Sequence, residues 1–165
     1  MKKIGKVYLN LMDHVNTIIG YLLALSLFFT TMITFWQVVS RFIGSSLSWS
    51  EELTRFLMIF MIMLGAAIAH RKNKLISVEI VVEQLKGWMK EVSFYLMHLF
   101  SIVFFIVLIV YGMNLASNFT NQIAPGTGIS MKYIYMSLPI GGGLMLLNSL
   151  ASLIEHWMKG DETSC

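Results

Sequence analysis

The stretch SWSEELTRFLMIFMIMLGAAIA, residues 48–69, joins three charged side chains to a long apolar run. Its uncharged part, Phe56–Ala69, has 14 residues, which is about 21 Å of helix. The hydrocarbon core of a bilayer is about 30 Å thick. A helix that crosses here must therefore draw Glu51, Glu52 and Arg55 into the membrane or hold them at its edge. Charge in that position is costly and usually has a functional or packing reason, so we expect this motif to matter for function.

The composition predicts an all-α integral membrane protein. Hydrophobic residues make up 56% of the 165 residues and charged residues 13%, against about 25% charged in soluble domains. The apolar residues form long blocks and do not alternate with polar ones, as the strands of a membrane β-barrel would require. We expect one transmembrane domain over residues 1–165, folded as a compact bundle. The basic residues flank apolar blocks without forming a continuous patch, which argues against nucleic-acid binding.

Four apolar segments are long enough to cross a bilayer with some tilt. The first follows a lysine-containing start that resembles a signal peptide, but its apolar run is too long for one and we interpret it as a retained span. The single cysteine, Cys165, allows no intramolecular disulfide. The predicted spans cover residues 17–40, 48–69, 92–116 and 132–154.

The distribution of basic residues predicts the orientation. Nine lysines and arginines flank the two ends that we place in the cytoplasm, and three lie on the other side. Both termini are therefore predicted to be cytoplasmic, with the charged motif and the 117–131 loop in the opposite compartment. The nine are Lys2, Lys3, Lys6, Arg71, Lys72, Lys74, Lys86, Lys90 and Lys159, and the three are Arg41, Arg55 and Lys132.

The loop between the second and third spans has the pattern of an amphipathic helix. Valine, leucine, tryptophan and methionine recur at helical spacing from Val78 to Val92, while Glu79, Glu83, Lys86 and Lys90 fall on the opposite face. This pattern favours a helix lying in the cytoplasmic interface over a solvated connector.

The charged motif has two interpretations from its spacing. Ser48 and Glu51 fit a capping box, and Arg55 follows the two glutamates by four and three residues, so that both can reach it. Capping alone does not explain a second acid and an arginine so close to lipid. We favour a contact with another protein subunit over capping alone or ion coupling. The residues predicted for that subunit interface are Arg41, Trp49, Glu51, Glu52 and Arg55.

Other polar or small residues within the spans predict helix packing. Gln37 is expected to hydrogen-bond to a neighbouring helix, and the Gly65–Ala69 pair allows close approach. Pro139 and Gly141 either serve the same purpose or break the fourth span at an ion site, and we favour packing. His98 is interpreted as a packed or interfacial histidine, in preference to a proton relay.

The sequence predicts no catalytic residue, metal site or cofactor. Glu51 and Glu52 are adjacent, so on a helix they point about 100° apart, a poor geometry for two carboxylates acting on one bond. The histidines show no metal-ligand spacing, and we find no nucleophile–base pair or phosphate loop. The chain is therefore not predicted to be an enzyme.

Several motifs together resemble one known family. These are Arg41–Gly44, the pattern Trp49-x-Glu51-Glu52-x-x-Arg55, the segment from Gly65 to Lys72, and Ser137–Gly141. With the length and the four-span layout, they resemble the small membrane subunit of tripartite ATP-independent periplasmic (TRAP) transporters. Residues 74–79 depart from the family, which often has a histidine, hydrophobic residues and an aspartate there.

The resemblance implies a role in a bacterial inner membrane. Such a subunit braces a larger membrane subunit, which holds the substrate and sodium sites, and helps to dock a periplasmic binding protein. The substrate is typically an organic acid, and sialic acid and C4-dicarboxylates both remain open. Facing the periplasm, Ser46, Asn121 and Thr127 are expected to contribute to docking. The alternatives are a stand-alone small transporter or channel, and a structural membrane anchor.

Overall fold

The computed structural model describes residues 2–45, 47–71 and 88–162 and is helical over nearly all of them. Apart from one isolated bridge, which pairs Ile123 with Ser130, the described residues form no strand. Four helices are long and apolar enough to cross a membrane, which confirms the predicted class. The helices are α1 (Lys2–Phe42), α2 (Ser48–Arg71), α4 (Trp88–Asn118), α5 (Met131–Tyr135) and α6 (Ser137–Glu162).

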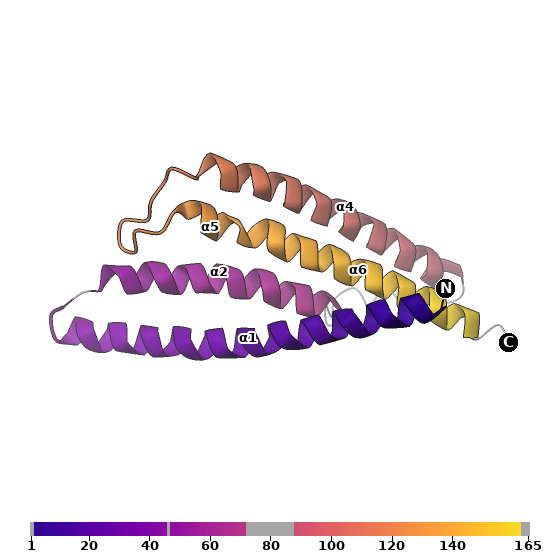
Figure 1. Ribbon diagram of the computed structural model, residues 1–165, viewed down its shortest axis with the longest axis horizontal. Helices are drawn as coiled ribbons and strands as arrows, with labels where there is room; N and C mark the ends of the chain where they lie inside the picture. Colours follow the sequence, from indigo (N-terminus) through magenta and orange to yellow (C-terminus); the bar gives the residue numbers. More distant parts are fainter. Residues whose placement is uncertain (1, 46, 72–87, 163–165) are drawn as a thin grey trace.

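Two predictions about topology are not tested by this fold. The predicted interfacial helix falls mainly on residues 72–87, which lie outside the described residues. Trp88, which we had placed on that helix, is the first residue of α4. Both marked ends of the chain lie at the same end of the molecule (Figure 1), and their cytoplasmic location stays a prediction.

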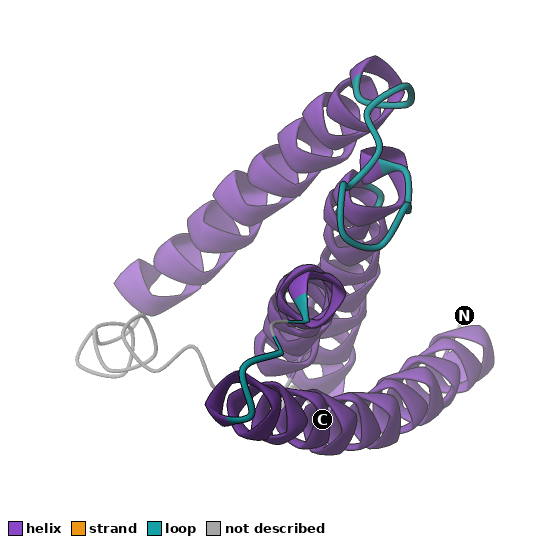
Figure 2. Ribbon diagram, turned by 90° about the vertical axis from the view of Figure 1, so that its left-hand side faces the viewer, coloured by secondary structure: helices purple, strands orange, loops and turns teal. Residues whose placement is uncertain are grey.

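The long helices stand in an open row, in which α4 and α1 are the outer helices. Figure 1 shows α4, α6, α2 and α1 side by side in that order, and Figure 2 shows α4 and α1 at opposite edges. In the described part of the chain, the α4 backbone approaches neither α1 nor α2 closely, whereas α6 packs on both α2 and α4. Small residues allow α6 to take a helix on each side, because Gly141 faces α2 and Gly142 faces α4.

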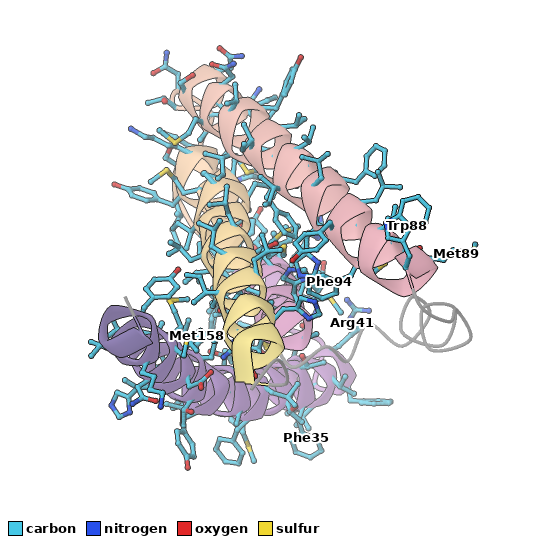
Figure 3. The ribbon with its side chains drawn as sticks, turned by 90° about the vertical axis from the view of Figure 1, so that its right-hand side faces the viewer. Phe35, Arg41, Trp88, Met89, Phe94 and Met158 are labelled. Atoms are coloured by element: carbon cyan, nitrogen blue, oxygen red, sulfur yellow. The ribbon has the colours of Figure 1, made fainter. Side chains whose placement is uncertain are left out.

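Helix α1 begins 15 residues earlier than the span predicted from hydropathy, at Lys2 instead of Thr17. Neither of the two prolines lies in this region, so nothing in the sequence ends the helix. Contacts with α6 hold the added turns: Tyr8 donates its hydroxyl to the Leu147 carbonyl at 3.0 Å. At Gly5 an added Cβ would lie 2.9 Å from Met158 Sδ, and Figure 3 shows Met158 on the side of α6 that faces α1.

The fourth predicted span is interrupted at Met136, between α5 and α6. Pro139 explains the interruption, because proline has no N–H to donate to the Tyr135 carbonyl and its ring crowds that carbonyl. The chain keeps its direction across the break, since the Met136 N–H donates to Lys132 at 3.0 Å and the Ile140 N–H donates to Met136 at 3.2 Å. The interruption is thus a local bend within one membrane crossing.

Glycines on α6 and α4 allow the closest helix contacts. A Cβ at Gly141 would lie 2.8 Å from Met63 Cβ of α2, and one at Gly142 would lie 2.8 Å from Leu108 Cδ2 of α4. On α4, Gly112 lies against Pro139, with its added Cβ 2.9 Å from the ring Cδ. Gly65 is different: the nearest atom to its added Cβ is a Leu23 methyl at 4.0 Å, which is ordinary contact with α1.

Replacing Gly141 by alanine is expected to destabilise the protein by about 1–3 kcal/mol, the usual cost of overpacking. The obstructing atom, Met63 Cβ, is fixed to the backbone of α2 and cannot turn away. Gly143→Ala is the matched control, because nothing lies within 4 Å of its added Cβ. Thermal unfolding in detergent should show a lower midpoint for Gly141→Ala alone. Equal midpoints for the two variants would contradict the contact.

Candidate functional site

The charged motif lies at the end of the row that also carries the 119–130 loop (Figure 1). Glu51 does not form the expected capping box. Its Oε1 accepts from Arg41 Nη2 at 2.6 Å and from Gln37 Nε2 at 3.0 Å, both on α1. The first turn of α2 is held instead by Ser50, which donates its hydroxyl to the Leu47 carbonyl at 2.8 Å. Glu51 therefore joins α1 to α2.

Glu52 holds a turn that is distant in sequence. Its carboxylate accepts from the N–H groups of Gly126, at 3.0 Å to each oxygen, and Thr127, at 2.9 Å. The Thr127 hydroxyl donates to the same carboxylate at 3.1 Å. Hydrogen bonds to an ionised acceptor are about twice as strong as neutral ones. We call the contact among Glu52, Gly126 and Thr127 the Glu52 clamp.

Gly126 is required by this geometry. A Cβ there would lie 3.0 Å from the carboxyl carbon of Glu52 and 3.0 Å from the Ser48 carbonyl oxygen. Gly128, two residues on, has a φ of +70°, a backbone conformation that suits glycine. Each glycine thus has its own reason to occupy its position in the turn.

The loop around the clamp is ordered by its own hydrogen bonds. The Ala124 N–H donates to the Ile129 carbonyl at 2.9 Å, and the Gly128 N–H donates back to Ala124 at 2.8 Å. Ala124 is fully buried and packs with Phe56 and Ile134. The loop is therefore fixed at its base by apolar contact with α2 and α5, and near its tip by the clamp.

The three predicted docking residues lie in different environments. Asn121 is exposed on the loop, while Thr127 is half-buried and engaged by Glu52. Ser46 lies outside the described residues. Trp49 is 43% exposed and lines a small apolar hollow with Trp36 and Met32 of α1.

Arg55 forms no ion pair within the described residues. Its side chain is exposed, and within the described ranges it has no carboxylate oxygen within 4 Å. Of the five residues predicted for the subunit interface, Arg41, Glu51 and Glu52 bond within the chain, whereas Trp49 and Arg55 face outward.

A second polar network, which the sequence did not reveal, lies at the opposite end of the row. Arg71 on α2 pairs with Asp13 on α1 at 3.0 Å and with Glu155 on α6 at 2.7 Å. The arginine side chain is 11% exposed, so its pairing ties three helices at a nearly buried point. These residues line an open cavity of about 850 Å³.

Two asparagines form a buried polar contact between α1 and α6. Asn148, fully buried, exchanges amide hydrogen bonds with Asn16 at 2.7 and 3.1 Å. Its Nδ2 also donates to the Ala67 carbonyl of α2 at 2.8 Å. An amide within an apolar span needs such a partner. Asn148 in the predicted fourth span was therefore a signal in the sequence, although nothing there identified Asn16 as its partner.

Three histidines from different helices gather around Phe94 of α4. The Phe94 ring stacks on His156 of α6 at a centroid distance of 4.0 Å and lies 4.2 Å from His98. His70 of α2 lies 6.4 Å from His98. Figure 3 shows Phe94 between α4 and α6. Within the parts of the chain that the structure describes, His98 has no hydrogen bond to an acid, and its Nδ1 lies 3.0 Å from the Phe94 carbonyl. Among the described residues, no group of three potential ligands could hold a metal ion.

These features define a class of protein: a small multi-pass helical membrane protein whose charged side chains join helix to helix and helix to loop. The chain belongs to the DctQ component family of tripartite ATP-independent periplasmic transporters, whose sequence model matches residues 30–159. It is accordingly a transporter subunit, which is not an enzyme class, and a multi-pass protein of the bacterial inner membrane.

Curated relatives carry matching names. A candidate TRAP transporter small permease protein of Haemophilus influenzae is 22% identical over 97% of this chain and 98% of its own length. The sialic acid TRAP transporter small permease protein SiaQ of Vibrio cholerae is 26% identical over 73% of this chain and 70% of its own. The sialic acid TRAP transporter permease protein SiaT of Haemophilus influenzae is 27% identical over 75% of this chain, but over only 20% of its own length.

Proposed function

We propose that this chain is the small membrane subunit of a sodium-coupled importer of organic acids that is served by a periplasmic binding protein. Family membership supports the transport role. Two of the relatives are named for sialic acid, which favours that substrate over C4-dicarboxylates. In one of them the matching region makes up a fifth of a longer permease. This supports a large membrane subunit as the partner.

The main support for the bracing role is that the long helices form an open row. Helices α1 and α4 stand at opposite edges and do not approach each other in the described part of the chain, so the row does not close around a pore. Salt bridges join α1 to α2 near both ends of α2, and an amide pair joins α1 to α6. An open layer of helices tied together in this way suits a support for another membrane protein better than it suits a channel.

The five motif residues have two distinct roles in this proposal. Trp49 and Arg55 contact the large subunit, because they face outward. Arg41 and Glu51 set the angle between α1 and α2, and Glu52 positions the loop.

Docking of the binding protein is assigned to the end of the row that carries the motif. The clamp gives the 119–130 loop a fixed shape there, and Asn121 and Pro125 are exposed on it. A fixed loop loses less conformational entropy on binding than a free one. Thr127 belongs to the same proposed surface and acts through the clamp, and the docking role of Ser46 stays a prediction. The proposal requires this end to face the periplasm, as the basic residues predict.

Reconstitution tests the proposed function. Liposomes would contain this chain with its cognate large subunit, and purified binding protein loaded with labelled sialic acid or succinate would be added outside. We expect uptake only when both membrane subunits, the binding protein and an inward sodium gradient are present. Liposomes with the chain alone are the control. Flux through the chain alone would favour a stand-alone channel, and uptake without the chain would overturn the proposal.

A further inference from the structure

Helix α2 carries an exposed stripe although it stands inside the row. After its first two residues, its exposed side chains are Glu51, Arg55, Met58 and Ile62. Their spacing of four, three and four places them along one face of a helix. Met58 and Ile62 are each 57% exposed. We call these four residues the α2 stripe. Since α1 and α6 occupy the flanks of α2, the stripe lies on a broad face of the row.

Arg55 is the charge of this stripe that makes no direct ion pair within the described residues, although the Glu52 carboxylate on the same turn attracts it. Glu51 shares its Oε1 with Arg41 and Gln37, and Glu52 is engaged by the clamp. Arg55 itself has no ion pair in the part of the chain that the structure describes. It lies seven residues beyond Ser48, about 10 Å along the helix axis. Inside a bilayer, a guanidinium at this position of α2 needs an acceptor that lies beside it.

The outer faces of α1 and α4 do not need a polar partner of this kind. The exposed side chains at the middle of α4 are apolar, among them Leu99 and Phe104, each 58% exposed. On α1 the outward residues include Leu25 and Phe35, and Figure 3 shows Phe35 pointing away from the other helices. Such faces can meet lipid tails directly. Compared with these faces of α1 and α4, the α2 stripe is covered poorly by lipid tails.

We infer that the α2 stripe receives a membrane-spanning helix of the large subunit, with a carboxylate of that helix placed opposite Arg55. This inference rests on the proposed function. A guanidinium binds a carboxylate through two parallel hydrogen bonds, and a buried pair of this kind fixes register and orientation. Met58 and Ile62 continue the stripe toward the middle of the membrane as an apolar surface, so the partner helix is apolar beside them.

Two other occupants fit less well. A second copy of this chain, related by a two-fold axis along the membrane normal, would place Arg55 opposite Arg55 and Glu51 opposite Glu51. Like charges at such short range repel. A lipid phosphate could pair with Arg55, but it offers no apolar surface to Met58 and Ile62.

Photo-crosslinking of the assembled complex tests the position of the partner. A photoreactive phenylalanine analogue would be placed at Met58 or Ile62, and at Leu99 or Phe104 as controls of matched exposure. We expect covalent products with the large subunit from the two α2 positions, at several times the yield from the α4 positions. Products with a second copy of this chain, or with lipid alone, would overturn the inference.

Charge changes at Arg55 test the chemistry. Arg55→Glu is expected to lower co-purification of the large subunit at least tenfold, Arg55→Lys to lower it less, and Lys132→Gln to leave it unchanged. Lys132 is an exposed cation near the same end of the row, away from the stripe. Selection for restored uptake in the Arg55→Glu strain should yield an acidic-to-basic change in a helix of the large subunit. Normal co-purification of Arg55→Glu would overturn the inference.

Different results would overturn the α2 stripe and the proposed function. Normal assembly of the Arg55 variants, with crosslinks from α4 and none from α2, would discard the α2 stripe and leave the proposed function standing. Failure of the unmodified chain to co-purify with the large subunit would discard the proposed function as well.

Discussion

Replacement of Glu52 by glutamine is expected to release the turn at Gly126 and Thr127. Glutamine keeps one acceptor oxygen but presents an NH2 group to the backbone donors that the second oxygen now binds. It also removes the charge that strengthens all four hydrogen bonds of the clamp. The amides of Gly126 and Thr127 should exchange with deuterium on the order of ten times faster. Mass spectrometry of peptides covering residues 119–130, in lipid nanodiscs, measures this.

Glu51→Gln is the matched control for the clamp, because the neighbouring carboxylate bonds to Arg41 and Gln37 instead of the loop. Its loop amides should exchange as in the unmodified chain. If the loop docks the binding protein, Glu52→Gln should also reduce uptake in the reconstituted system severalfold. Unaltered exchange in Glu52→Gln would show that the loop does not depend on the clamp.

Replacement of Asn148 by alanine is expected to lower the free energy of unfolding by about 2 kcal/mol. The change removes three hydrogen bonds between helices at a fully buried position and leaves a small cavity. Single polar contacts between membrane helices are worth about 0.6 kcal/mol on average and up to about 1.7. Reversible unfolding in mixed micelles, followed by the near-ultraviolet signal, gives the free energy difference.

Ser149→Ala is the control for this change. Ser149 is equally buried, but within the described part of the chain its hydroxyl has no hydrogen-bond partner. Its removal should cost little or nothing. A double-mutant cycle with Asn16→Ala should give a coupling energy of about 1 kcal/mol, because the two amides bond reciprocally. Independent effects of the two changes would contradict the pairing.

Much of the architecture follows from local physical rules. The apolar run of residues 56–69 and its three counterparts are long enough to cross a bilayer. Three of the four runs each lie on one helix, and the fourth extends over α5 and α6. Pro139 also predicts the bend at Met136, since its effect on the preceding carbonyl is local. The early start of α1 could have been expected too, because nothing in residues 2–16 interrupts a helix.

The contacts that build the candidate site could not be predicted from the sequence by such local rules. Glu52 lies 74 residues from Gly126, and Asn16 lies 132 residues from Asn148. Sequence spacing correctly placed Glu51 and Glu52 on the first turns of a helix, but it offered Arg55 as their nearest partner. The fold instead gave each acid a partner outside α2. Helix packing decides which of several nearby cations or donors each glutamate binds. The spacing of residues in a single sequence does not reveal that packing.

The length of α1 has a mechanical consequence. Its 41 residues form a rod of about 62 Å, roughly twice the thickness of the hydrocarbon core. An unbroken rod of this length must tilt steeply or project from the membrane, and its tilt has to follow the local bilayer thickness. Because Arg41 near one end is tied to Glu51, and Asp13 toward the other is tied to Arg71, a change of tilt is passed to both ends of α2 together. The tilt of the subunit therefore depends on the thickness of the membrane around it. Lipids of different chain length would change the angle at which the subunit meets its partners.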